Sequence, residues 1–221
     1  MNSSPIIQLL VLAGIAVFLI LRLRSVLGTR EGYEKPAVTR PTPERRGKRP
    51  EFDVIEGGPD LDITDHVPED SDSARALAAM KRVDPSFSVR DFLGGARGAY
   101  EMILMAFERG TLDEVVPFIS KDVYEAFASV VDQRQSQGLT IEADFIGVSD
   151  MTLTEATFDD ATSEGEITVR FKSEMSWLVR DNGGDIIEGS KTEIKRQKDT
   201  WTFARKMDSD DPNWRLVATD A

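Results

Sequence analysis

Few side chains in this sequence are suited to catalysis. Cysteine is absent, which excludes a thiolate nucleophile, a disulfide and a cysteine metal site. The one histidine, His66, lies among acidic residues, and we interpret it as a solvated side chain. Tyr100 and Tyr124 fall in predicted helices and Asp144 near the start of a predicted strand, but no spacing pairs an acid with a base. We therefore expect no enzyme, no catalytic residue, no metal and no cofactor.

The helices that would position these residues begin after Asp84. Ser88 and Asp91 form a weak capping box, and Gly110 is placed to end the helix that follows. The apolar positions of this long helix recur at helical spacing: Phe92, Ala96, Tyr100, Ile103 and Phe107. A short helix is predicted from Thr111 through Pro117, and a third helix from Ser120 to Gly138.

After Gly138 the apolar period changes from 3.6 to 2, which is typical of strands. The alternation is clearest at Ile167, Val169 and Phe171, and residues 181–184 predict a hairpin turn. Further strands are predicted at 141–148, 151–158, 186–196, 200–206 and 214–218. Three helices followed by antiparallel strands predict an α+β domain over residues 84–221, with the helices on one face of a curved sheet.

Residues 28–83 are predicted to be a disordered linker with segregated charge. Residues 22–50 hold nine Lys or Arg against three Glu, whereas residues 51–72 hold nine Asp or Glu and no Lys or Arg. The basic part either binds anionic lipid headgroups or is a solubilising linker. A candidate docking motif lies in the acidic part, at Phe52, Val54 and Ile55, and residues 73–83 are compatible with one short helix.

The first 27 residues are predicted to be a membrane anchor with its flank. From Ile6 to Leu21 the only polar residue is Gln8, and this run would cover about 24 Å as a helix. The basic residues Arg22, Arg24 and Arg30 follow the run, so the positive-inside rule places the N-terminus outside and the domain in the cytoplasm. The whole chain has a net charge of −12, which argues against a nucleic-acid partner.

Several spaced blocks of the predicted domain resemble the Tim44-like family, in the order that the family has them. They are FLGGARGAYEMILMAFERGTLDEVVPFIS from Phe92, DVYEAFASVVDQRQSQG from Asp122, ITVRFKSE from Ile167, and the closing stretches DTWTFARK and DPNWRLVAT. The resemblance implies a fold similar to nuclear transport factor 2, in which a bent sheet wraps the first helix as a cone. With its own predicted anchor, the chain looks like the short bacterial relatives found in the inner membrane.

The resemblance also implies an apolar pocket between the long helix and the sheet. Its candidate lining residues are Phe92, Ala96, Tyr100, Phe107 and Phe127, which are equally suited to a packed core. A lipid acyl chain or an apolar peptide would fit such a pocket.

Three functions stay open. The first is an adaptor at the cytoplasmic face of the inner membrane that binds lipid or membrane-linked proteins, in protein translocation or membrane-protein quality control. The others are an enzyme of the same fold and a scaffolding subunit with a filled pocket. The mitochondrial relative uses a long N-terminal region to bind its motor and channel, and that region is replaced here, so its motor role is not carried over.

Overall fold

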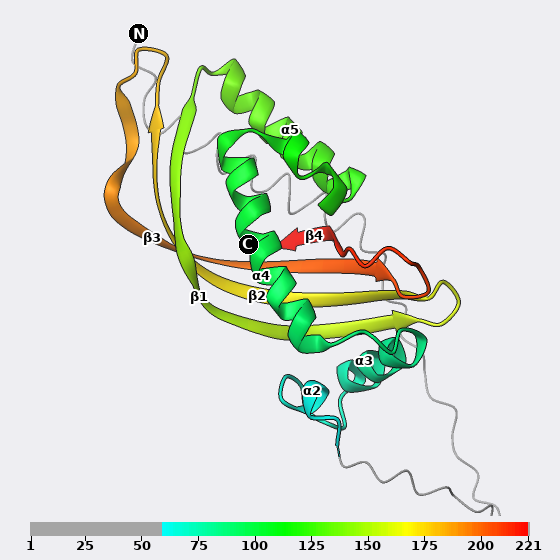
Figure 1. Cartoon of the computed structure of the whole chain (residues 1–221). Coiled ribbons are helices and arrows are strands. Elements are labelled where there is room, and N and C mark those ends of the chain that lie inside the picture. The colour runs from blue at the N-terminus through cyan, green and yellow to red at the C-terminus, as the bar shows by residue number, and fades with distance from the viewer. Residues whose placement is uncertain (1–58, 221) are drawn as a thin grey trace, which may run out of the picture. The chain divides into compact units, whose positions relative to one another are not determined.

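The computed structural model describes residues 59–220, which form an α+β domain built on one antiparallel sheet (Figure 1). Its strands follow the order β1-β2-β3-β4, with each strand beside the next along the chain. Their bounds are β1 Thr140–Asp159, β2 Glu164–Arg180, β3 Ile186–Lys206 and β4 Arg215–Asp220. The α+β prediction is confirmed. The predicted pairs of strands 141–148 with 151–158 and 186–196 with 200–206 are each one long, bent strand.

Bulges bend the sheet. Three times along β1, at Ile146, Ser149 and Thr154, one extra residue interrupts the register with β2. Such extra residues bend a strand and increase its twist. Two of them also bond sideways to β2, because Ser149 Oγ donates to Lys172 O at 3.1 Å and Thr154 Oγ1 donates to Thr168 O at 3.2 Å. The bend therefore follows from individual residues that the alternation pattern does not distinguish.

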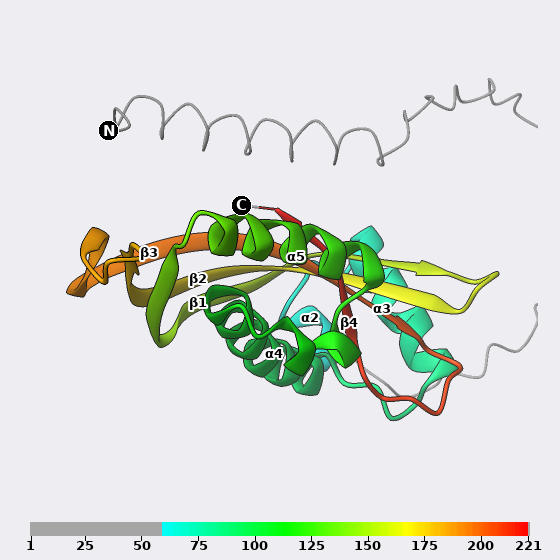
Figure 2. The same cartoon turned by 90° about the horizontal axis from the view of Figure 1, so that it is seen from above.

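Helix α4, Val89–Arg109, packs on one side of this sheet in both views (Figures 1 and 2). Its start is capped by Ser88, whose hydroxyl accepts from Asp91 N, and its end by Gly110 at φ 73°, as predicted. Phe92, Ala96 and Tyr100 are all buried, so the predicted apolar stripe of α4 faces the core.

After α4 the chain makes two single turns of 3-10 helix, η1 Leu112–Glu114 and η2 Val116–Phe118, where the sequence predicted one short helix. Helix α5, Lys121–Ser136, begins after Ser120, whose side chain accepts from Val123 N. Gly138 follows at φ 68° and turns the chain into β1, as predicted.

The predicted linker 28–83 is wrong over its last 25 residues, because residues 59–83 belong to the folded domain. Helix α2, Leu61–Thr64, and helix α3, Asp72–Val83, contribute Ile63, Leu77 and Met80 to the main core. These apolar residues are few among many acidic ones, so composition alone suggested a tether. The expected short helix at 73–83 is confirmed as α3. Residues 1–58, including the candidate motif at Phe52, Val54 and Ile55, lie outside the described residues.

Within residues 59–220, none of the helices combines the length and the apolar character needed to cross a bilayer. The predicted anchor, from Ile6 to Leu21, and its flanking residues Arg22, Arg24 and Arg30 precede this part of the chain.

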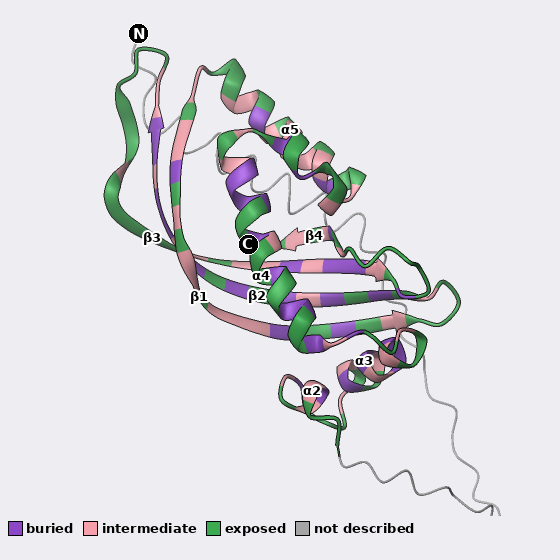
Figure 3. Ribbon diagram, viewed as in Figure 1, coloured by how far each residue is buried: buried purple, intermediate pink, exposed green. Residues whose placement is uncertain are grey.

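Two ends of the domain can be distinguished by their elements (Figure 3). The closed end comprises α2, α3, the start of α4 and the β1–β2 hairpin. The open end comprises the last turns of α4, helix α5 and the sheet arm, by which we mean residues 140–148 of β1, 173–180 of β2 and 186–196 of β3. β4 pairs with β3 only from Thr200 to Ala204, and the preceding part of β3 is largely exposed, as Figure 3 shows.

Candidate functional site

A polar cluster interrupts the apolar core between α4 and the sheet. The hydroxyl of Tyr100 donates to the carboxylate of Asp199 and lies 2.8 Å from Ser173 Oγ. Gln197 Nε2 donates to Tyr100 Oη at 3.2 Å and to Asp199 Oδ2 at 3.0 Å. Burial raises the pKa of the Asp199 carboxyl, and burial together with the bond to Asp199 raises the pKa of Tyr100. The sheet thus brings together a carboxyl, a phenol, an amide and a hydroxyl.

Large rings enclose this cluster. The ring of Tyr100 stacks on Phe171 with 4.3 Å between centroids, and Trp201 lies 4.7 Å from it. Tyr100 has no exposed surface. The resemblance implied an apolar pocket between α4 and the sheet, but around Tyr100 this place is filled by the domain's own side chains.

A small cavity lies at the open end instead. Its volume is about 140 Å³, and it is lined by residues from the last turn of α4, from α5 and from the start of β1: Phe107, Glu108, Arg109, Gly110, Val131, Arg134, Gln135, Leu139, Thr140 and Ile141. Small-molecule pockets usually measure about 300 to 1,000 Å³. This cavity is too small for a typical ligand of that kind.

A charged pair borders this cavity. Arg134 Nη1 lies 3.5 Å from Glu108 Oε2, and its guanidinium sits 4.4 Å from the centre of the Phe107 ring. Burial raises the pKa of the Glu108 carboxyl, and the positive charges of Arg134 and Lys195 partly offset that rise. The contact is long for an arginine bond to a carboxylate, which is usually 2.7 to 2.9 Å.

Half-buried aromatic residues lie at the open end, and one of them, Phe107, lines the cavity. Phe107 packs on Phe127 with 4.6 Å between ring centroids. On the sheet arm, Phe145 and Trp177 are also half-buried, and the ammonium of Lys195 lies 4.7 Å from the centre of the Trp177 ring. Aromatic residues of this kind, apolar but still accessible, are typical of protein interfaces.

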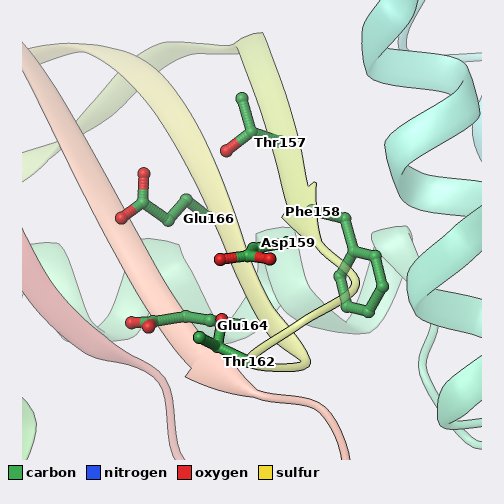
Figure 4. Close-up of a pocket in the computed structure, with 6 residues that line it drawn as sticks. All are labelled: Thr157, Phe158, Asp159, Thr162, Glu164 and Glu166. Carbon is green, nitrogen blue, oxygen red and sulfur yellow. The ribbon is translucent and has the colours of Figure 1, made fainter.

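A second cavity, of about 270 Å³, lies at the β1–β2 hairpin and is lined by Thr157, Phe158, Asp159, Thr162, Glu164 and Glu166 (Figure 4). In Figure 4 the carboxylates of Asp159, Glu164 and Glu166 extend to one side and the ring of Phe158 to the other. Burial and the neighbouring charges of Glu164 and Glu155 raise the pKa of Glu166. Within residues 59–220, no group of three or more potential ligands is arranged to hold a metal ion.

The five predicted lining residues do not share one cavity. Phe92, Ala96 and Tyr100 are core residues, with exposed fractions of 6%, 4% and 0%. Phe107 lines the cavity at the open end, and Phe127 packs on it. Three of the five residues are therefore buried in the core.

Sequence reasoning missed the polar partners of Tyr100 and the pair at Glu108 and Arg134. Ser173 stands between Phe171 and Met175 on the buried face of β2, so a polar residue in an apolar alternation was an available signal. Asp199 shares the face of Trp201 in the same way. No local pattern relates Glu108 to Arg134, because only the packing of α4 against α5 brings them together.

Comparison with known proteins identifies the family. The model of the Tim44-like domain matches residues 73–221. Among curated proteins, the chain is 24% identical over 163 residues to "Mitochondrial import inner membrane translocase subunit TIM44-1" of Arabidopsis thaliana, covering 70% of this chain and 34% of the relative. It is 23% identical over 155 residues to "Mitochondrial import inner membrane translocase subunit TIM44" of Homo sapiens, covering 68% of this chain and 34% of the relative. The matches thus span about a third of each relative's length.

Among solved structures, the intermembrane space region of the chloroplast protein ARC6 matches with a TM-score of 0.39 and 10% identity, over 58% of this chain and 94% of that one. The Tim44-like match begins within α3, in agreement with the packing of α3 against the core. Because the family model covers more than half of the sequence, the chain belongs to the Tim44-like domain family.

Proposed function

We propose that this chain is a membrane-anchored adaptor whose Tim44-like domain binds a protein partner at its open end. The observation that carries the proposal is the group of half-buried aromatic residues at the open end: Phe107 in the cavity lining, Phe127 packed on it, and Trp177 on the sheet arm. Both curated relatives are named as subunits of a mitochondrial inner-membrane import translocase, which supports a role in protein translocation. Membrane-protein quality control is a second role compatible with such an adaptor.

The size of the cavity favours a protein partner over a lipid. A cavity of about 140 Å³ is less than half of the smallest usual ligand pocket, about 300 Å³. A single side chain from a partner suits that volume, whereas an acyl chain needs a longer apolar channel. Interface energy is commonly concentrated in a few such anchors.

The anchor is the second part of the proposal. Residues 6–21 would span the bacterial inner membrane once, with the N-terminus outside and the domain in the cytoplasm, as the basic residues after Leu21 favour. A topology reporter fused after Ala221 of the full chain should show the activity of a cytoplasmic protein. Activity on the outer side would reverse this orientation.

One observation favours an enzyme as the second candidate. Asp199 and Tyr100 bond to each other inside the fold, and burial raises the pKa of the carboxyl, as general acid catalysis requires. Against this, Tyr100 is fully buried, and its hydroxyl is already bonded. A cell that carries only Asp199→Asn should behave like wild type if the chain is an adaptor. Loss of function with an unchanged amount of folded protein would favour the enzyme.

Photocrosslinking tests the adaptor directly. A photoreactive amino acid is placed in the full chain at Trp177, at Phe127, or at Arg170 as a control, and native membranes are irradiated. Arg170 is exposed and follows Val169 on the outward face of β2. We expect protein adducts from Trp177 and Phe127 and few from Arg170. Equal adducts at all three positions, or adducts with lipid alone, would contradict the proposal.

A further inference from the structure

Two arginines at the cavity of the open end have unused hydrogen-bond donors. Arg134 uses only Nη1, in contacts of 3.5 Å with Phe107 O and Glu108 Oε2, and its Nε and Nη2 make no hydrogen bond within residues 59–220. Arg109 is exposed and makes no hydrogen bond or ion pair in that part of the chain. Guanidinium groups with free donors are well suited to bind carboxylates, often with two parallel bonds.

The border of the cavity, which we call its rim, is basic, whereas the domain as a whole is acidic. Residues 59–221 contain 18 Lys and Arg against 33 Asp and Glu, a net charge of −15. Around the cavity, by contrast, Arg109 and Arg134 outnumber Glu108. An acidic segment is repelled by most of the domain and attracted to this rim, so the charge distribution favours one place for it.

We propose that this cavity binds Phe52 from a second copy of the chain, with Glu51 and Asp53 paired to Arg134 and Arg109. The stretch Glu51-Phe52-Asp53-Val54-Ile55-Glu56 places an aromatic residue between two carboxylates, which matches a cavity whose lining combines apolar side chains with two arginines. One large side chain fits the cavity volume of about 140 Å³. This inference rests on the proposed function, since it names an occupant of the same open end.

The length of the chain favours a second copy as the donor. The seven residues from Phe52 to Pro59 span at most about 25 Å when fully extended. Asp62 is bonded to the first turn of α4, at Val89 N and Arg90 N, whereas the cavity begins at Phe107, about 27 Å further along the helix axis. The chain's own Phe52 would have to run fully extended along α4, and a neighbouring copy has no such constraint.

The pairing has a consequence for the adaptor. A partner that binds at the open end would compete with the second copy for the same cavity. Self-association would then be the resting state, and partner binding would release it.

The test places a photoreactive amino acid at position 52 of the full chain, mixed with a second full-length copy that carries a different tag. Crosslinks between the two copies should map to 107–110, 131–135 and 139–141. A peptide of residues 50–58 should compete, and the same peptide with Phe52→Ala should not. Crosslinks within one copy, at other surfaces, or to lipid alone would overturn the inference.

Charge reversal checks the pairing independently of folding. Arg109→Glu together with Arg134→Gln should lower the yield between copies by at least about tenfold, since the loss of one arginine–carboxylate bond alone is expected to have that effect. Arg97→Gln, an exposed change on α4, is the matched control. Asp53→Lys in the donor copy should restore crosslinking to an Arg109→Glu acceptor, which a misfolded acceptor cannot do; no restoration would overturn the pairing.

The experiments distinguish failure of the partner site from failure of the second copy as its occupant. If no crosslinks form between copies but protein adducts at Trp177 persist, the partner site stands and the second copy is excluded as its occupant. If both are absent, the open end is not a docking site and both proposals are wrong.

Discussion

The closed and open ends of the domain are built from similar residues but are held together differently. At the closed end Lys81 Nζ lies 2.7 Å from Asp62 and Arg205 Nη2 lies 2.8 Å from Asp84, and the side chains of both pairs are at most 22% exposed. At the open end Arg180 Nε lies 2.6 Å from Glu142, but these side chains are 31% and 38% exposed, and Glu108 and Arg134 are 3.5 Å apart. Leu77 at the closed end is fully buried, while Phe107, Phe127 and Trp177 at the open end are only half-buried. On the function proposed above, the closed end maintains the fold and the open end binds the partner.

The largest expected effect is a core substitution at the closed end. Leu77→Ala in the full chain should lower the free energy of unfolding by about 2 to 5 kcal/mol, because it leaves a cavity where α3 packs on the sheet. Urea unfolding, monitored by tryptophan fluorescence, measures this loss of stability. A loss below about 1 kcal/mol would mean that α3 is a dispensable addition to the domain.

The next effect concerns the contact between α2 and α4. Burial opposes ionisation of Asp62, but the Lys81 ammonium and the N–H groups of Arg90 and Val89 hold its pKa at about 2. Since the pKa is lower in the folded state, this carboxylate stabilises the domain above about pH 4, and the stabilisation is lost as the pH falls toward 2. Asp62→Asn should therefore cost about 1 to 2 kcal/mol at pH 7.

Unfolding measured from pH 7 down to pH 2 should show the two proteins converging in stability. Arg97→Gln, an exposed change on α4 that leaves the contacts of Asp62 intact, is the control. A constant difference over this range would contradict the assigned role of the charge.

A smaller effect is expected at the open end. Phe127→Ala should cost about 1 kcal/mol, because the half-buried ring loses chiefly its contact with Phe107. The same substitution should strongly reduce partner adducts from Trp177. A stability loss as large as that of Leu77→Ala would show that Phe127 chiefly stabilises the fold, which would contradict a binding role for the open end.

The polar cluster gives a pH-dependent prediction. Burial raises the pKa of Asp199 in the folded state, so this carboxyl favours folding when protonated and the benefit is lost as the pH rises through the raised pKa. Asp199→Asn should be neutral or stabilising at pH 7. As the pH falls toward 4, the free energy of unfolding of the variant should decrease relative to that of wild type. Thermal unfolding of both proteins at pH 7 and at pH 4 measures this stability difference. The prediction is contradicted if the variant compares worse with wild type at pH 7 than at pH 4.

The smallest effect is expected on the outer face of the sheet. Arg196 pairs with Glu174 at 2.8 Å, but its side chain is 83% exposed. Arg196→Ala should change the free energy of unfolding by less than about 0.5 kcal/mol, because exposed ion pairs contribute little. A larger loss in urea unfolding would mean that the sheet arm depends on its surface charges.

Much of this architecture was predictable from periodicity and caps. Ser88, Gly110 and Ser120 mark helix boundaries because their effects are local, and the alternation at Ile167 to Phe171 marks the buried face of β2. The folded status of residues 59–83 was not predictable from composition, since α2 and α3 depend on contacts with distant parts of the chain.

The candidate site was less predictable for the same reason. Tyr100 and Asp199 are 99 residues apart in the sequence, and Glu108 and Arg134 are 26 residues apart. Only the packing of α4 against the bent sheet and α5 brings each pair together. Likewise, the register changes at Ile146, Ser149 and Thr154 cannot be recognised in a period-two pattern. They nevertheless bend β1, which runs from the open end to the closed end.

Amide hydrogen exchange on the full chain tests the central claim most directly, measured in membranes before and after the partner is removed. The account predicts strong protection of α3 and the start of α4 in both samples. It predicts that the partner increases protection chiefly at residues 124–135, 139–145 and 175–179. Partner-dependent protection confined to α2, α3 or the β1–β2 hairpin would contradict it, because binding would then occur at the end that maintains the fold.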